Sequence, residues 1–455
     1  MMKGKRETGL RRQIRPERVL ALGFLTLIVL GTVLLALPAA TVTGTPLSVF
    51  DSLFTATSAV CVTGLVAVDT GTTFSAFGQG VLLTLIQVGG LGFMVFATLI
   101  MVMLGRRISL QNRVLIRESM NTATLSGLVK LTEVYGVMAV GIELLGAALL
   151  SIRFVPLYGV GRGIWFSIFH AVSAFCNAGF DLFGGYSSLT GFYNDPLVLL
   201  TVSLMVILGG LGFSVELEVL RNREGWRGLS LHTRLVLPVT GLLLALGTLF
   251  FAAVEWNNPA TLGGQGVGTK LLGAFFQSVT MRTAGFNSVD LGGMTGASKM
   301  FSSILMFIGA SPASTGGGVK TTTVAVLMLT VWSVIRGQDD VNVMGKRLPT
   351  ELLRRALALV VISLTVLLSM TVVIAAAEND RVPFIDLLFE MASAVATVGV
   401  SAVGTPKLSI VSRAVIIPVM YFGRVGPLTL ALALANKMNN TVNRRKYPEE
   451  KVMIG

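Results

Sequence analysis

The chain has 455 residues, of which 53% are hydrophobic and 13% are charged. An ordinary soluble domain carries about 25% charged residues, so this composition excludes a protein whose main solvent is water. The net charge of +13 would suit a nucleic-acid-binding protein. However, the basic residues gather in segments separated by stretches long enough to cross a membrane twice, as the positive-inside rule requires, so the charge indicates topology and excludes nucleic acid as a partner. These segments are the N-terminus, 106–130, 221–234, 336–355 and 437–451.

The first apolar run, 19–37, follows the basic N-terminal segment as the core of a signal peptide would. It is long and has no small-residue cleavage site, so we predict a retained first membrane helix. Further apolar runs at 81–104, 197–215 and 356–377 approach or exceed the roughly 20 residues that span a membrane as a helix. The sequence therefore predicts a polytopic membrane protein.

The long apolar helices are predicted in four pairs, and each pair encloses a shorter apolar segment. The short segments, such as 46–60 and 383–395, have about 12 to 15 residues and cannot span a membrane. We expect them to be re-entrant pore helices. The predicted pairs are 18–38 with 76–104, 127–152 with 194–220, 229–255 with 298–335, and 352–377 with 410–436.

Each short segment ends in a similar motif that contains one glycine. The motifs are SAVCVTGL (58–65), SAFCNAGF (173–180), SVTMRTAGF (278–286) and SAVATVGV (393–400), with glycines at Gly64, Gly179, Gly285 and Gly399. These glycines are separated by 115, 106 and 114 residues. Such regularity indicates an internal repeat, so we predict an all-α integral membrane protein with eight membrane-spanning helices and four pore helices, arranged with fourfold pseudosymmetry around one pore.

Non-helical backbone at membrane depth is tolerated only where protein buries it or where it lines a wet path. Rings of backbone carbonyls can replace the hydration shell of a cation, and glycine lets the chain aim them inward. Alternatively, these glycines allow close packing of membrane helices. Each loop has one glycine where the TVGYG potassium filter has two, which predicts a shorter or less selective filter.

A polar, glycine-rich segment, IGASPASTGGGVK, interrupts the predicted helix 298–335. Three glycines each cost about 1 kcal/mol in a helix interior relative to alanine, and Pro312 costs more, so the helix should break there. One interpretation is a static kink. The other is an intramembrane loop that changes conformation cheaply.

Arg424 occupies the matching place in the fourth repeat, within FGRVGP. An arginine at the membrane centre costs about 2.5 to 3.5 kcal/mol even on insertion scales, so it should face a wet cavity or a partner. We consider an electrostatic barrier in the ion path and a structural bond to carbonyls at a helix break. Arg282 should point away from a cation filter and hold its loop through an acid or a carbonyl, whereas Cys61 and Cys176 suit packing.

The remaining polar residues predict no enzyme chemistry. Asp51 and Asp386 stand 13 residues before their glycines, at the start of pore helices, where carboxylates suit helix capping. His170 and His232 are too isolated to predict a metal site. The segment GGGVKT lacks the spacing of a phosphate-binding loop, so we do not expect ATP hydrolysis by this chain.

The motifs VCVTGL, FCNAGF, MRTAGF and ATVGV, together with GASPASTGGGVKTTT and FGRVGP, resemble the KtrB branch of the Trk/Ktr/HKT potassium transporter superfamily. The resemblance covers about 18–438. It implies a potassium-translocating subunit with a filter at the four loops and a gate at 309–323. Sodium-selective plant relatives place serine where this chain has Gly64, which favours potassium as the main transported ion. Sodium coupling stays open, and we expect no bound cofactor.

The resemblance also implies partners: a second copy of the chain as a homodimer, and a cytosolic ring of nucleotide-binding regulatory subunits of the RCK/KtrA type. Basic segments 106–117 and 437–451 are candidate docking surfaces, although topology and contact with membrane lipid also explain them. The expected location is the bacterial cell membrane, with both termini cytoplasmic. Two alternatives are the potassium-binding subunit of an ATP-driven pump and an ion-coupled secondary transporter, although secondary transporters usually show inverted or twofold repeats.

The predicted site and organisation can be stated by residue. The filter residues are Cys61, Val62, Thr63, Gly64, Cys176, Asn177, Ala178, Gly179, Thr283, Ala284, Gly285, Thr397, Val398 and Gly399. The gating residues are Gly309, Ser311, Pro312, Ser314, Thr315, Gly316, Gly317, Gly318, Lys320 and Arg424. The pore repeats are 18–104, 127–220, 229–335 and 352–436, joined by cytoplasmic loops 105–126, 221–228 and 336–351 and flanked by cytoplasmic termini 1–17 and 437–455.

Overall fold

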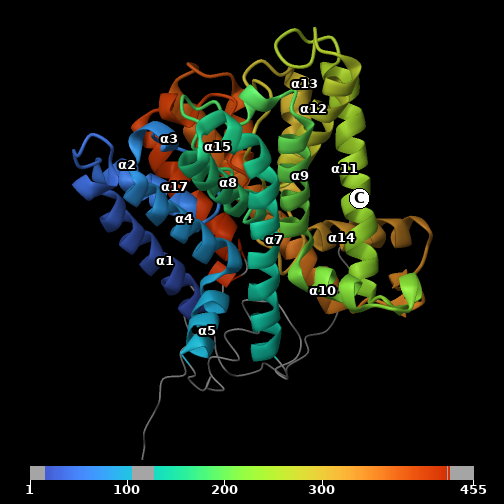
Figure 1. Ribbon diagram of the computed structural model, residues 1–455. Helices are drawn as coiled ribbons and strands as arrows, with labels where there is room; N and C mark the ends of the chain where they lie inside the picture. The colour runs from blue at the N-terminus through green and yellow to red at the C-terminus, as the bar shows by residue number, and fades with distance from the viewer. Residues whose placement is uncertain (1–15, 105–127, 428, 431–455) are drawn as a thin grey trace, which may run out of the picture.

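The computed structural model describes residues 16–104, 128–427 and 429–430 (Figure 1). Within this part of the chain the elements are helices, apart from a two-residue antiparallel hairpin of β1 (Asn342–Val343) and β2 (Lys346–Arg347). The predicted all-α fold is therefore confirmed. The predicted N-terminal segment, the loop 105–126 and the C-terminal tail lie almost entirely outside the described residues, as do the two candidate docking surfaces.

Each repeat begins with one long, unbroken helix. These helices are α1 (Pro16–Leu35), α7 (Leu128–Tyr158), α11 (Leu231–Glu255) and α15 (Thr350–Glu378). Among the described residues these four are long and apolar enough to cross a membrane. They expose large apolar side chains, such as Val137 at 76% and Leu249 at 67%. Surfaces this apolar fit a lipid solvent and would be a liability in water.

A shorter helix follows in each repeat and buries its C-terminal half. These helices are α2 (Val49–Val60), α8 (Val160–Phe175), α12 (Val267–Thr280) and α16 (Phe384–Val395). Their ends pack in the main hydrophobic core, where Phe54, Phe175, Phe276 and Phe389 are at most 1% exposed. The core therefore surrounds the points at which the four short helices end.

The second long helix of each repeat is broken. A bend of 100° at Gly92 separates α4 (Ala76–Leu91) from α5 (Phe93–Met103), and one of 97° at Gly212 separates α9 (Pro196–Leu211) from α10 (Phe213–Arg221). In the fourth repeat α17 (Ile410–Val425) ends before Gly426. Gly92, Gly212 and Gly426 have φ of 84°, 96° and 91°, which a helix cannot contain. The helices predicted at 76–104 and 194–220 are therefore each broken in two, and the helix predicted from 410 ends at Val425, close to the helix break that one interpretation of Arg424 expected.

The third repeat has a longer interruption. Here α13 (Gly296–Phe307) and α14 (Thr321–Ile335) are separated by the segment 308–320, which lies between the two helices as an irregular loop. The break predicted from Pro312 and the three glycines is thus present. The remaining short elements are α3 (Thr70–Thr73) and the 3₁₀ turns Pro38–Ala40, Thr190–Phe192, Gly225–Gly228 and Thr405–Lys407.

Candidate functional site

The four motif loops share one backbone conformation. After each short helix the chain takes a positive φ two residues before the glycine, and again at the glycine itself. The first position has φ of 55°, 57°, 69° and 51° at Val62, Asn177, Thr283 and Thr397. A positive φ is uncommon for residues other than glycine, so its recurrence at matched positions marks a conformation that the surrounding structure imposes. The glycines have φ of 92°, 69°, 86° and 97° at Gly64, Gly179, Gly285 and Gly399.

The four loops meet in a closed ring. A Cβ added at Gly64 would lie 3.3 Å from Cα of Gly399, and it would also meet the carbonyl of Ala178. A Cβ at Gly285 would lie 2.6 Å from the carbonyl oxygen of Val398 and 2.7 Å from Cα of Gly179. Each loop therefore contacts the next in chain order, and the fourth contacts the first. No side chain fits at these glycines without displacing backbone.

Hydroxyl groups of the short helices form hydrogen bonds with the backbone of the loops. Ser58 Oγ accepts a hydrogen bond from Gly64 N at 3.0 Å, and Ser393 Oγ accepts one from Gly399 N at 2.9 Å. In the second repeat the equivalent Ser173 donates from Oγ to the carbonyl of Phe180 at 2.7 Å, just past the glycine. The third repeat replaces this contact with a bond from the Thr280 hydroxyl to the Phe286 carbonyl. Each loop is thus bonded within its own repeat.

The other predicted filter residues lie beside the ring, buried at 1% exposure or less. The Asn177 amide and the Thr283 hydroxyl, from neighbouring loops, lie 3.2 Å apart. The hydroxyls of Thr63 and Thr397 are buried and have no hydrogen-bond partner among the described residues. Cys61, Val62, Cys176, Ala178, Ala284 and Val398 pack in the core beside them.

The interrupting segment of the third repeat lies directly beside the ring. A Cβ at Gly316 would meet the hydroxyl of Thr283, and one at Gly317 would meet that of Thr397. A Cβ at Gly318 would lie 3.3 Å from that of Ala396, at the end of the fourth short helix. The three consecutive glycines are therefore required by space, because the segment passes against two of the four loops without room for side chains.

Bonds to the second repeat hold this segment. The backbone N–H groups of Ser311 and Thr315 donate to the carbonyls of Gly210 (3.0 Å) and Gly209 (3.1 Å), at the end of α9. The Thr315 hydroxyl donates to the Gly209 carbonyl at 2.9 Å. Phe213 N, the first residue of α10, donates to the Ala313 carbonyl at 3.1 Å. The bend in the second repeat thus supplies the groups that bind the segment.

Arg424 binds three backbone carbonyls. Its guanidinium donates to the carbonyl of Thr315 in the interrupting segment and to the carbonyls of Gly89 and Gly90 at the end of α4, the last at 2.9 Å. The structural bond at a helix break, one of our two interpretations of Arg424, is therefore present. Lys320, whose Nζ donates to the Gly316 carbonyl at 2.6 Å, closes the segment on itself.

The predicted anchor for Arg282 was wrong. The described residues include no acid or carbonyl bonded to its guanidinium, and its Nε is buried without a hydrogen-bond partner. The side chain instead borders a small cavity beside Val206, Leu244 and Ala310. These neighbours are apolar and come from α9, α11 and the interrupting segment, so the sequence around Arg282 contains no signal of them.

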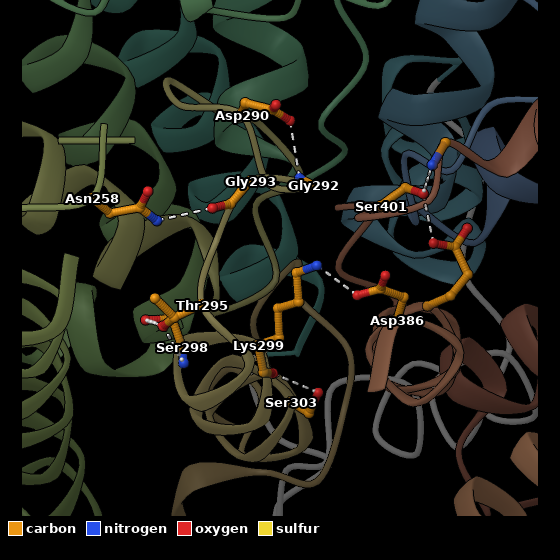
Figure 2. Close-up of polar contacts among 12 residues, drawn as sticks. Asn258, Asp290, Gly292, Gly293, Thr295, Ser298, Lys299, Ser303, Asp386 and Ser401 are labelled. Atoms are coloured by element: carbon orange, nitrogen blue, oxygen red, sulfur yellow. Dashed lines mark hydrogen bonds and ion pairs between the residues drawn. The ribbon is translucent and has the colours of Figure 1, made fainter. Parts of the chain in front are cut away.

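Sequence reasoning missed two cations that bind the start of the short helices. Lys299 of α13 pairs with Asp386 of α16 at 2.7 Å (Figure 2). Arg413 of α17 pairs with Asp51 of α2 at 3.1 Å. Lys299 and Arg413 are both the fourth residue of their helices, and this shared position is the signal that could have found them. Each pair ties a short helix to the preceding repeat, with the first repeat following the fourth.

Four helix, re-entrant loop and helix units around one ring, in a largely apolar chain, define the pore-loop class of membrane cation transporters. The chain belongs to the TrkH family of cation transport proteins, because residues 17–446 match the sequence model of that family. This confirms the resemblance that its motifs indicated, and the family is one of transporters rather than enzymes.

Curated relatives match over nearly their whole length. The chain is 42% identical to Ktr system potassium uptake protein B of Bacillus subtilis, covering 97% of both chains. It is 38% identical to potassium/sodium uptake protein NtpJ of Enterococcus hirae, covering 98% of both. Among solved structures, the potassium transporter TrkH of Vibrio parahaemolyticus shares the fold with a TM-score of 0.72 at 16% identity, over 94% of this chain and 86% of that one.

Proposed function

We propose that this protein takes up potassium ions across the bacterial cell membrane, with the ring of four loops as its selectivity filter. The observation that carries the proposal is that each of the four glycines lies against a neighbouring loop, so that the four loops form a single closed ring. Their backbone carbonyls would replace the hydration shell of a passing ion. The driving force is the inside-negative membrane potential, worth about 2.3 kcal/mol per charge at 100 mV.

The segment 309–323 is proposed as the gate. It lies against the ring at Thr283 and Thr397, where it would obstruct an ion that has passed the filter. Its residues 309–320 are irregular and only 321–323 belong to α14, so most of the segment can move without unwinding a helix. Arg424 would act in two ways, by bonding the segment in place and by adding a positive charge near the ion path. Both actions oppose permeation while the segment is in this position.

The names of the relatives support the proposed ion and partners. Two relatives are Ktr system potassium uptake proteins B, the second from Vibrio alginolyticus at 40% identity. A system so named has more than one component, which fits a cytosolic nucleotide-binding regulatory ring and a homodimer of this chain. We propose sodium as a second ion, because the relative from Enterococcus is named a potassium/sodium uptake protein. We place both termini in the cytoplasm on the distribution of basic residues.

The deciding experiment measures tracer potassium uptake into proteoliposomes that contain the purified protein under an imposed inside-negative potential. Sodium and rubidium serve as competitors. Potential-driven uptake that rubidium inhibits more strongly than sodium is the expected result. Absence of uptake in both the presence and the absence of sodium would contradict the proposal. The two alternatives, a pump subunit and an ion-coupled secondary transporter, gain no support from the family match.

A further inference from the structure

One buried position recurs in each of the four short helices. It is the residue nine places before each ring glycine, and it is buried at 1% exposure or less in all four repeats. The four residues differ chemically: Thr55, His170, Phe276 and Glu390. Two of them, in the second and fourth repeats, carry ionisable side chains deep in the core. A buried group of this kind is costly unless it is bonded, so its bonds indicate its role.

Glu390 binds the chain that leaves the ring in the fourth repeat. Its carboxyl oxygens accept hydrogen bonds from Ser401 Oγ and Thr405 Oγ1, both at 2.6 Å. Ser401 follows Gly399 by two residues, and its hydroxyl also accepts a bond from Gly404 N at 2.9 Å (Figure 2). One carboxyl group of the pore helix therefore fixes two points of the segment just beyond the ring.

His170 makes the corresponding contact in the second repeat. Its Nδ1 lies 2.7 Å from the carbonyl of Phe166 and therefore carries the proton. The other nitrogen, Nε2, accepts a hydrogen bond from the backbone N–H of Leu182 at 3.4 Å. Leu182 follows Gly179 by three residues. The imidazole also stacks on Phe183, with ring centroids 4.3 Å apart. His170 therefore binds the segment that follows the ring glycine of its own loop.

The first and third repeats lack this contact. The hydroxyl of Thr55 is buried without a hydrogen-bond partner among the described residues, and Phe276 has no polar group to offer. Because the loops contact one another in chain order around the ring, the second and fourth loops face each other across it. Of the four loops around the pore, only the second and the fourth are therefore bonded by this position of their short helix, and these two loops lie opposite each other.

We propose that Glu390 and His170 are positioning residues that hold these two facing loops and so set the discrimination between potassium and sodium. The proposal rests on the proposed function of the ring as a filter. Carbonyl rings select between ions through the positions and flexibility of their oxygens. In the first repeat the short helix bonds its loop no further than Gly64, whereas in the second and fourth repeats it also bonds the segment that follows the glycine, which restricts movement of that segment.

The test compares variants of full-length protein in proteoliposomes. Glu390→Ala removes both acceptors and should lower the potassium-to-sodium uptake ratio by about threefold or more, equivalent to about 0.7 kcal/mol. Glu390→Gln keeps an acceptor and a polar partner for the two hydroxyls and should restore most of the ratio. His170→Phe should lower the ratio as Glu390→Ala does.

Two matched controls separate positioning from general stability. Glu378→Ala removes a carboxyl that is also buried and also accepts two bonds, from Ser409 N at 2.9 Å and Ser412 Oγ at 2.5 Å, but that binds the start of α17 rather than a ring loop. It should lower the melting temperature and leave the ratio unchanged. Thr55→Val, at the unbonded equivalent position, should leave the ratio unchanged.

The proposal is overturned if Glu390→Ala and His170→Phe keep the wild-type ratio, or if Glu378→Ala lowers it equally. Wild-type uptake and the ring variant Gly64→Ser are measured in parallel. If wild-type protein transports no potassium, the proposed function fails. If Gly64→Ser changes the ratio while the Glu390 and His170 variants do not, the filter stands and the positioning proposal alone fails.

Discussion

The ring and the interrupting segment lie in contact, yet they are held differently. Each ring loop is bonded to the short helix of its own repeat, as Ser58 and Ser393 illustrate. The interrupting segment is bonded within itself and also to groups from other repeats, which are the end of α9 and the guanidinium of Arg424, itself bonded to the end of α4. Bonds within each repeat keep the ring in one geometry, and we propose that the bonds from other repeats let the segment move away without unfolding its neighbours. Three substitutions and one deletion test this comparison.

The largest effect is expected from Gly64→Ser in the ring. A side chain there would meet the carbonyl of Ala178, and φ of 92° is strained for serine. Together these costs amount to about 2 kcal/mol. We expect the potassium-to-sodium uptake ratio to fall by about tenfold or more. Gly80→Ser, at a glycine of α4 with open space around it, is the control and should keep the ratio. An unchanged ratio in Gly64→Ser would remove this residue from the filter.

The next effect concerns the segment itself. Deleting 313–318 removes the glycines that lie against Thr283 and Thr397, so the obstruction should disappear. We expect potassium uptake per folded protein to rise by about tenfold, as for the loss of about 1.4 kcal/mol of barrier, and to depend less on the cytosolic regulator. Folding is checked by gel filtration. Folded deletion protein with equal or lower uptake would instead make the segment a support.

Arg424→Ala tests whether Arg424 acts as an electrostatic barrier to the ion or only as a structural bond to backbone carbonyls. A charge about 5 Å from the ion path opposes a cation by about 3 kcal/mol at an effective dielectric of 20. Loss of hydrogen bonds from a charged group costs about 1.5 to 3 kcal/mol. Because Arg424 binds the carbonyls of Thr315 and Gly90, whose negative ends offset most of this charge, we expect a lower melting temperature together with uptake about fivefold higher, equivalent to about 1 kcal/mol of barrier. Reduced stability without faster uptake would refute the barrier and leave only the bond.

The smallest effect is expected from Thr315→Val. It removes the hydroxyl that donates to Gly209 and Phe175 but leaves the backbone bonds of the segment intact. A neutral hydrogen bond contributes about 0.5 to 1.5 kcal/mol, so potassium uptake should rise by about threefold. Thr330→Val on α14, whose hydroxyl bonds only within its own helix, is the control. Equal uptake in both variants would show that the side chain does not hold the segment.

The sequence predicted the parts of this site that repeat along the chain. The four glycines, the short helices before them and the break near Pro312 were all recognisable, because spacing and local cost are properties of the sequence. The bends at Gly92 and Gly212 were missed, since a glycine in a membrane helix is common and its positive φ depends on what packs around it. The pairing of Lys299 with Asp386 and the isolation of Arg282 depend on contacts between distant segments, which no local pattern contains.

The break in the second long helix of each repeat suggests how such a pore could arise in evolution. Three repeats break at a single glycine, Gly92, Gly212 or Gly426, whereas the third holds the segment 308–320 at the corresponding break. Duplication of one ancestral unit would supply the breaks in all four copies. A lengthening of the chain at one existing break would then add a moving part while leaving the other three copies as scaffold. On this account regulation enters by divergence of one copy, and the shared architecture does not have to be rebuilt.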